Sequence, residues 1–239
     1  MSFLRCGKFN LSLSRPLIMG IVNVTPDSFS DGGCFFSVDA ALAQAERLIG
    51  EGADILDVGG ESTRPGATPV PLEVELDRVL GVIEALRDCR APISIDTYKP
   101  EVMRAGISAG ASMVNDVNAL EAPGAPEAVA ESEAAVCLMH KQGDPQTMQL
   151  DPRYDDVVRE VRGYLGERAN VCLAAGIARE RIVIDPGFGF GKTADHNLAL
   201  LRELAQLKSL GFPVLAGLSR KSLLGKLTRR PITERVYSS

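Results

Sequence analysis

A chain of 239 residues is long enough for two ordinary domains, but it also has the size of one α/β barrel. Apolar residues make up 45% and charged residues 24% of the sequence, which is a globular composition and excludes a disordered or fibrous chain. The formal net charge of -5 argues against nucleic-acid binding through bulk charge, and no apolar run is long enough to predict a membrane span.

The cysteine content bears on the compartment. The sequence has five cysteines, an odd number, and none of them form a Cys-x-x-Cys pair. This pattern argues against a disulfide framework or a zinc ribbon and favours a reducing environment. The first ten residues lack the apolar segment of a secretory signal. We therefore expect a cytoplasmic protein.

Short apolar runs alternate with longer segments of helical periodicity along the chain. Most of the runs are continuously apolar, which is typical of parallel strands buried on both faces. Strands are predicted at 17–22, 53–58, 92–95, 111–114, 135–139, 181–184 and 213–218. Helices are predicted after Ser37, after Pro71 (placed at the first helical position), at 100–109, 124–132, 155–175 and 195–209, and from Arg220 onward. Residues 8–14 are predicted to form an antiparallel hairpin with the strand that follows them.

Regular alternation of strand and helix predicts an α/β fold of the (β/α)₈ TIM-barrel type, with a doubly wound open sheet as the alternative. About seven βα units are present. Residues 219–239 leave room for roughly one helix, so the eighth strand and its helix are missing from the sequence. We treat residues 1–239 as a single barrel domain that is incomplete at its C-terminus.

Every predicted strand carries a polar or charged residue near or directly after its carboxyl end. These residues are Asn23, Asp57, Asp96, Asn115 with Asp116, His140, Asp185, and the group from Ser219 to Ser222. The carboxyl ends of parallel barrel strands lie on one face, where barrel enzymes carry their active sites. The sequence therefore predicts one site that opens at this end.

The predicted site has two chemical halves. Asp96, Asn115 and Asp185 emerge from apolar strands, where an unpaired polar group is costly, and a flat heterocycle that carries N–H donors would satisfy them. The alternative is that each side chain only caps a strand end.

The second half is an anion site. Arg64, Arg220 and Lys221 lie in Gly- and Ser-rich segments that suit phosphate binding. Asn23, with Asp27 and Asp31 nearby, offers the oxygen ligands that Mg²⁺ takes when it also holds phosphate. The alternative is that Arg220 and Lys221 form a solvated helix start.

Three further signals are discounted. The sequence Gly191-Lys192-Thr193 resembles the end of a P-loop, but Pro186 stands where that motif requires glycine. His140 and His196 lack partners at metal-ligand spacing, and His196 is expected at the surface near a helix start. The cysteines are expected to be structural, with Cys34 the one worth testing for reactivity.

Seven segments carry a family resemblance. In chain order they are NVTPDSFSDGG, DVGGESTRPGA, ISIDTYKPEV, NDV, LMHKQGDPQTMQ, IDPGFGFGK and GLSRKSLLG. They resemble the signature blocks of the bacterial dihydropteroate synthase family over about residues 17–235. The resemblance implies a (β/α)₈ barrel and a transferase of folate biosynthesis. That enzyme joins 6-hydroxymethyl-7,8-dihydropterin diphosphate to 4-aminobenzoate and releases diphosphate and 7,8-dihydropteroate.

The resemblance also assigns roles to residues. The pterin pocket is implied to contain Asp57, Asp96, Asn115, Asp185 and Lys221, with Met139 and Phe190 as apolar walls. The 4-aminobenzoate subsite is implied to contain Phe29, Thr63, Pro65, Phe190 and Ser222. Asn23 matches the position for Mg²⁺ and diphosphate. The catalytic roles fall to Asp31, which faces the reacting carbon, to Arg64 as an anion contact, and to Lys221.

The sequence departs from the family at its end. Family members continue into an eighth strand that carries an Arg-x-His pair for the diphosphate. Truncation of an ordinary synthase is the explanation we favour, over a complementing second chain or an altered protein. The alternative function is therefore a catalytically weak or inactive pterin-binding protein. A methyltransferase domain that binds methyltetrahydrofolate would not explain Lys221-Ser222 or the STRPGA segment. The family's homodimer is in doubt here, because its dimer surface draws on the last helices.

Overall fold

The computed structural model describes residues 2–25, 38–62, 67–144 and 147–219, together with the single positions Lys221, Gly225, Thr228, Arg229, Pro231 and Glu234. The C-terminal helix predicted from Arg220 onward, like the predicted cap at Ser37, falls mostly or wholly outside these residues. No helix within the described ranges is long and apolar enough to cross a membrane.

The centre of the fold is a parallel sheet whose strands follow one another in chain order. Its members are β3 (Met19–Asn23), β4 (Ile55–Gly59), β5 (Ile93–Asp96), β6 (Met113–Asp116), β7 (Ala135–Met139) and β8 (Ile182–Asp185). Val214 adds a parallel bridge to Ile184, so the strand predicted at 213–218 is reduced to one bridging residue. This consecutive order is that of a TIM-barrel wall and contradicts the doubly wound alternative, in which the strand order reverses.

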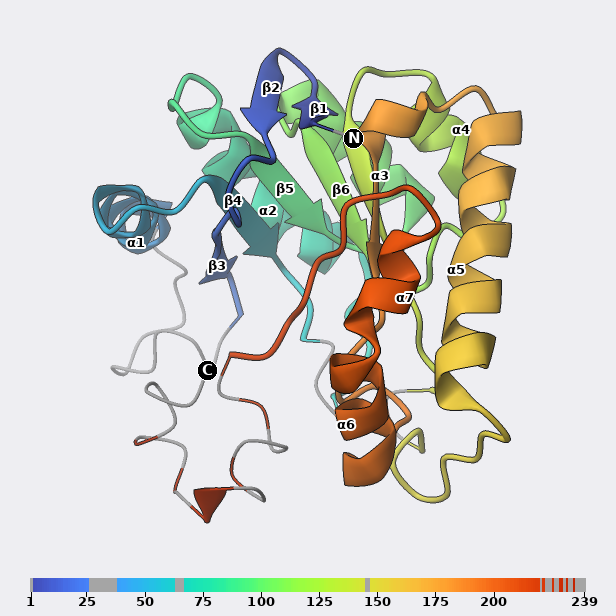
Figure 1. The fold of residues 1–239 in the computed structure, drawn as a ribbon. Helices are drawn as coiled ribbons and strands as arrows, with labels where there is room; N and C mark the ends of the chain where they lie inside the picture. The colour runs from blue at the N-terminus through green and yellow to red at the C-terminus, as the bar shows by residue number, and fades with distance from the viewer. Residues whose placement is uncertain are drawn as a thin grey trace.

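Helices cover the outside of this sheet (Figure 1). They are α1 (Val38–Gly50), α2 (Leu72–Leu86), α3 (Pro100–Ala109), α4 (Ala125–Ala130), α5 (Val157–Ala174), the 3₁₀ turn η2 (Arg179–Arg181), α6 (Ala194–Arg202) and α7 (Leu204–Lys208). The helix predicted over 195–209 is two helices, because Glu203 leaves the helical conformation between them. Pro71 is the N-cap of α2 rather than its first residue.

The N-terminal hairpin differs from the prediction. β1 (Phe3–Cys6) pairs with β2 (Phe9–Ser12), so the partner of residues 8–14 is the segment before them. Gly7 explains the difference, because its φ of +54° lets the chain reverse ahead of that segment. Leu4 and Cys6 pack on side chains near the starts of β6, β7 and β8. The hairpin therefore plugs the amino end of the strands.

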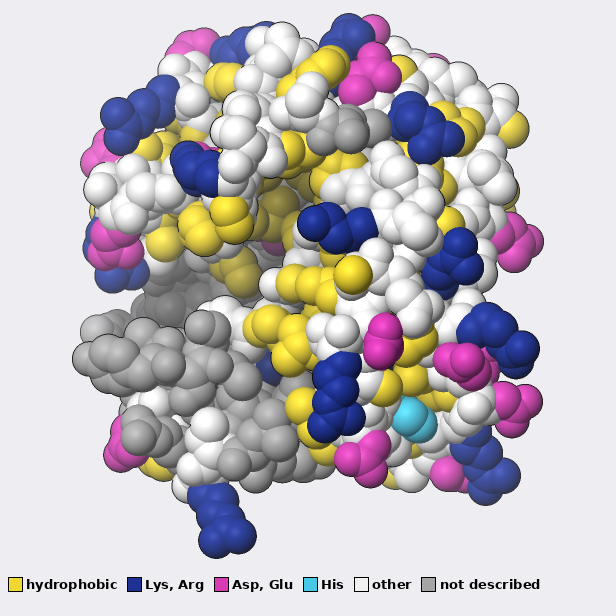
Figure 2. Space-filling view, viewed as in Figure 1, with side chains coloured by type: hydrophobic (Ala, Val, Ile, Leu, Met, Phe, Trp, Pro, Cys, Tyr) yellow, Lys and Arg dark blue, Asp and Glu magenta, His cyan; other side chains and the backbone are white. Residues whose placement is uncertain are grey.

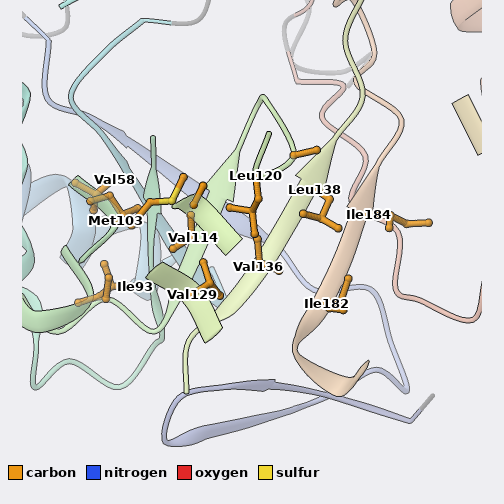
Figure 3. Packing of buried hydrophobic residues seen from close by; sticks show 14 of the residues in the cluster. Val58, Ile93, Met103, Val114, Leu120, Val129, Val136, Leu138, Ile182 and Ile184 are labelled. Atoms are coloured by element: carbon orange, nitrogen blue, oxygen red, sulfur yellow. The ribbon is translucent and has the colours of Figure 1, made fainter. Parts of the chain in front are cut away.

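Strand residues alternate between the core and the barrel interior. Val114, Val136 and Leu138 belong to the large hydrophobic core between the sheet and the helices (Figure 3). Asn115 and Met139 occupy the other parity, so they face the interior. The space-filling view is hollowed near its centre, with hydrophobic side chains on the rim (Figure 2). This alternation places the polar strand ends inside the barrel at its carboxyl end.

Candidate active site

Polar side chains near the carboxyl ends of β4, β5 and β6 form a row, with Asp57 two residues before the end of β4. The register pairs Gly59 with Asp96 and Asp96 with Asn115 on the neighbouring strands. Asn115 reaches back across β5, and its Nδ2 donates a hydrogen bond of 3.1 Å to Asp57 Oδ2. Gly59 lies directly beside the Asp96 side chain. The structure thus brings together three of the residues that the sequence assigns to one pocket.

The carboxylates of this row are held in an unfavourable environment. Asp57 is only 5% exposed, and its burial raises its pKa to about 6. Burial raises the pKa of Asp96 well above its ordinary value, and the negative charges of Asp57 and Asp116 add to the effect. Asp57 Oδ1 and Asp96 Oδ1 are buried without a hydrogen-bond partner. Such orphaned acceptors cost free energy until a ligand supplies donors.

A second corner of the site is built around Asp185 at the end of β8. Its Oδ1 accepts a 2.7 Å hydrogen bond from the Gly187 backbone N–H. Burial raises its pKa, and the nearby Lys221 opposes that shift. Lys221 in turn donates to the Phe188 carbonyl, and its Nζ lies 4.8 Å from the centre of the Phe190 ring. A carboxylate, a cation and an aromatic face therefore share this corner.

Met139 and Asn23 complete the set of predicted residues that the structure describes. Met139 is buried and is the register partner of Asp185, as expected of an apolar wall. Asn23 is exposed at the end of β3 and pairs in register with Gly59. No group of three or more His, Cys, Asp or Glu residues suited to a metal occurs in the part of the chain that the structure describes. The side-chain oxygen of Asn23 is one candidate metal ligand at this face.

The remaining predicted site residues lie outside the described residues. They are Phe29, Asp31, Thr63, Arg64, Pro65 and Ser222. The predicted 4-aminobenzoate subsite and most of the predicted anion site thus stay predictions, as do the suggested roles of Asp27 and Arg220.

Two of the polar strand-end residues have structural roles instead. Asp116 accepts hydrogen bonds from the backbone of Asn118 and Leu120, so it caps a turn. His140 is buried, and its burial lowers its pKa to about 3, which keeps the ring neutral. His196 is the third residue of α6 and forms a capping box with Thr193, at the predicted helix start but only half-exposed.

Sequence reasoning missed an ion cluster beside the site. Lys99, at the start of α3, binds Glu61 Oε2 at 2.5 Å and the Val70 carbonyl at 2.8 Å, and it also contacts Glu75. Tyr98 donates a 2.9 Å hydrogen bond to Glu61. Lys99 thereby joins both ends of the segment between β4 and α2. The signal was present, because Lys99 follows the third strand within the quoted ISIDTYKPEV block.

Comparisons with known proteins agree with this geometry. The family described as pterin binding enzyme matches residues 19–239. The dihydropteroate synthase of Escherichia coli is 51% identical over 231 residues, which are 96% of this chain and 82% of the relative. The Xanthomonas albilineans dihydropteroate synthase structure with 4-aminobenzoic acid has a TM-score of 0.93 at 55% identity, over all of this chain and 86% of that one.

A third comparison is with a complex. The structure of the Burkholderia cenocepacia dihydropteroate synthase complexed with 7,8-dihydropteroate has a TM-score of 0.88 at 50% identity, and it covers all of this chain and 84% of that one. Identities of 50% or more thus extend over nearly the whole chain, and the TM-scores show the same fold. The chain therefore belongs to the pterin binding enzymes and, within them, to the dihydropteroate synthases.

Proposed function

We propose that this chain condenses 6-hydroxymethyl-7,8-dihydropterin diphosphate with 4-aminobenzoate to give 7,8-dihydropteroate and diphosphate. The observation that carries the proposal is the pair of buried, unpartnered oxygens, Asp57 Oδ1 and Asp96 Oδ1. The aminopyrimidine edge of a pterin presents several N–H donors in one plane, which suits two such acceptors. The relatives support the synthase rather than an inactive pterin-binding protein.

The described residues bind and orient the pterin in this proposal. Asp57, Asp96 and Asn115 line one side of the ring, and Asp185 with Lys221 lines another. The buried Met139 and the half-buried Phe190 provide apolar surface for the ring faces. A rigid set of partners on separate strands holds the reacting methylene group in one place, which lowers the entropic part of the barrier.

The reaction exchanges one bond for another. The bond between the methylene carbon and the diphosphate oxygen breaks, and its electron pair leaves with diphosphate. The neutral amine of 4-aminobenzoate then forms the new C–N bond and loses one proton to water or to the departing diphosphate. We assign Asp31 to the face of the reacting carbon, Arg64 to the anion, and Phe29, Thr63, Pro65 and Ser222 to the aminobenzoate.

Magnesium fits the donor set in a limited way. Mg²⁺ prefers oxygen ligands and usually keeps waters and substrate phosphates, so a single protein oxygen from Asn23 is compatible with it. When bound there, Mg²⁺ would offset the negative charge that develops on the departing diphosphate. We include Mg²⁺ in the proposed reaction on this ground.

A direct assay tests the function. We expect dihydropteroate and diphosphate to form in equal amounts when both substrates and Mg²⁺ are mixed with the protein, and formation to fall when Mg²⁺ is chelated. Asp185→Asn should weaken binding of the pterin substrate at least about tenfold, because the carboxylate that this proposal places against the ring loses its charge. Pterin binding without any product would contradict the proposal.

Two further expectations concern the location of the protein and its oligomeric state. A cytoplasmic location is supported by the free state of the described cysteines Cys6, Cys89, Cys137 and Cys172. A homodimer is implied by the family resemblance alone. Sedimentation of the purified protein would distinguish a dimer from a monomer.

A further inference from the structure

A buried lysine lies behind the pocket, outside the set of residues assigned above. Lys192 is 3% exposed, and its Nζ lies 2.9 Å from the Phe190 carbonyl, 3.1 Å from the Gly187 carbonyl and 3.2 Å from the His140 carbonyl. The fourth neighbour is His140 Nδ1 at 2.9 Å. These acceptors come from His140, directly after β7, and from the loop that follows β8.

The loop gathered by Lys192 is also the loop that shapes the Asp185 corner. Gly187 donates its N–H to Asp185, and the Phe188 carbonyl accepts from Lys221. The loop is packed tightly, because a Cβ on Gly187 would lie only 1.9 Å from the His140 carbonyl oxygen. Lys192 thus contacts the same backbone whose other groups hold the pocket.

A buried cation of this kind is costly unless it is compensated. No ion pair among the described residues includes Lys192. Its compensation comes from carbonyl dipoles. The Gly187 carbonyl also accepts from the Phe190 N–H, whereas the His140 and Phe190 carbonyls depend on the lysine for a donor. The lysine and the loop therefore stabilise each other. A role in stability alone would not explain why Lys192 binds the same loop that contacts Asp185 and Lys221.

We propose that Lys192 is a positioning residue that sets the pterin affinity by fixing the loop beneath Asp185, Phe190 and Lys221. The proposal rests on the pterin pocket of the proposed function. Lys192 acts through these residues.

The charge of Lys192 gives the proposal a second readout. Burial lowers its pKa to about 7, with Asp185 opposing the shift and Lys221 adding to it. The titratable groups that face it are His140 after β7, Asp185 at the end of β8, and Lys221. His140 is neutral over this range, so Lys192 itself loses the proton as the pH rises through about 7. Because a neutral amine has one N–H fewer for the same carbonyls, pterin affinity should fall.

The test uses the full chain and 6-hydroxymethyl-7,8-dihydropterin, which lacks the leaving group and is not consumed. Calorimetry should show about tenfold weaker binding to Lys192→Met than to the wild type at pH 6.5, as expected when a loop under a binding site is misplaced. Lys208→Met, an exposed lysine on α7, is the matched control and should bind like the wild type. Circular dichroism and urea unfolding check that each variant is fully folded under the assay conditions, because a partly unfolded variant would show a raised apparent dissociation constant.

The remaining outcomes are also decisive. If Lys192→Met does not fold, Lys192→Gln, which keeps two N–H donors, replaces it and should bind more weakly than the wild type at pH 6.5. The wild type should lose affinity between pH 6.5 and 8.5 by more than Lys192→Met or its replacement does. Equal affinities of wild type and variant would overturn this inference alone. A wild type that binds no pterin would overturn the proposed function and this inference with it.

Discussion

Single carboxylates in this site carry a cost to stability that the proposed ligand would relieve. Asp57 illustrates this, because its folded-state pKa of about 6 lies above the ordinary value of 3.8. The folded protein therefore binds a proton that the unfolded chain has lost between these values. It follows that stability is lost as the pH rises from about 4 through about 6.

Asp57→Asn should separate stability from function. At pH 8 we expect the variant to be more stable than the wild type by on the order of 2 kcal/mol, since a buried charge is gone and an amide oxygen can still accept from Asn115. At pH 4 the two proteins should be similar. Urea unfolding at both pH values measures this, with the exposed Asp88→Asn as the control. A variant no more stable than wild type at pH 8 would contradict the cost assigned to burial.

The same substitution should weaken pterin binding. A neutral amide offers an N–H where the ligand also has an N–H, so we expect at least about a tenfold loss of affinity. Calorimetric titration with 6-hydroxymethyl-7,8-dihydropterin provides the measurement. Unchanged binding would mean that Asp57 faces something other than the ring edge.

Among the elements, the segment between β4 and α2 depends on one lysine. Lys99 neutralises Glu75, which is only 1% exposed, and Glu61 at the other end of the segment. Lys99→Met leaves two carboxylates close together, and we expect a loss of about 3 kcal/mol in the free energy of unfolding. Double replacement of Lys99 and Glu75 by Met should recover part of the loss. If the single variant unfolds at the wild-type urea concentration, the cluster contributes nothing to stability.

The hairpin of β1 and β2 should affect stability without affecting catalysis. Leu4 is buried against the amino ends of the strands, opposite to the site. Leu4→Ala should therefore cost about 2–4 kcal/mol through the cavity it leaves, while the KM values for both substrates stay unchanged. Thermal unfolding and steady-state kinetics test the two halves of this expectation. A changed KM would show that the two ends of the barrel are coupled.

At the scale of the whole molecule, strand order and the single polar face were predictable from the sequence. Continuous apolar runs ended by Asp57, Asp96 and Asp185 suffice for both, because parallel strands align their ends. Pairing of the hairpin was not predictable in the same way, since it depends on the backbone of Gly7. The role of Lys192 was also missed. A local motif search tests it against a P-loop, whereas its partners at His140 lie 52 positions away.

The unpartnered oxygens of Asp57 and Asp96 should also determine which molecules the site excludes. Consider a molecule of the same shape as the pterin, with lone pairs where the pterin edge carries hydrogens. Both carboxylates would repel it, and neither would receive a hydrogen bond from it. Sites of this kind bind such analogues far more weakly than the cognate ligand, because each mismatch leaves a desolvated polar group without a hydrogen-bond partner. Selectivity among flat bicyclic compounds in the cell would then come mainly from exclusion, and only secondarily from shape.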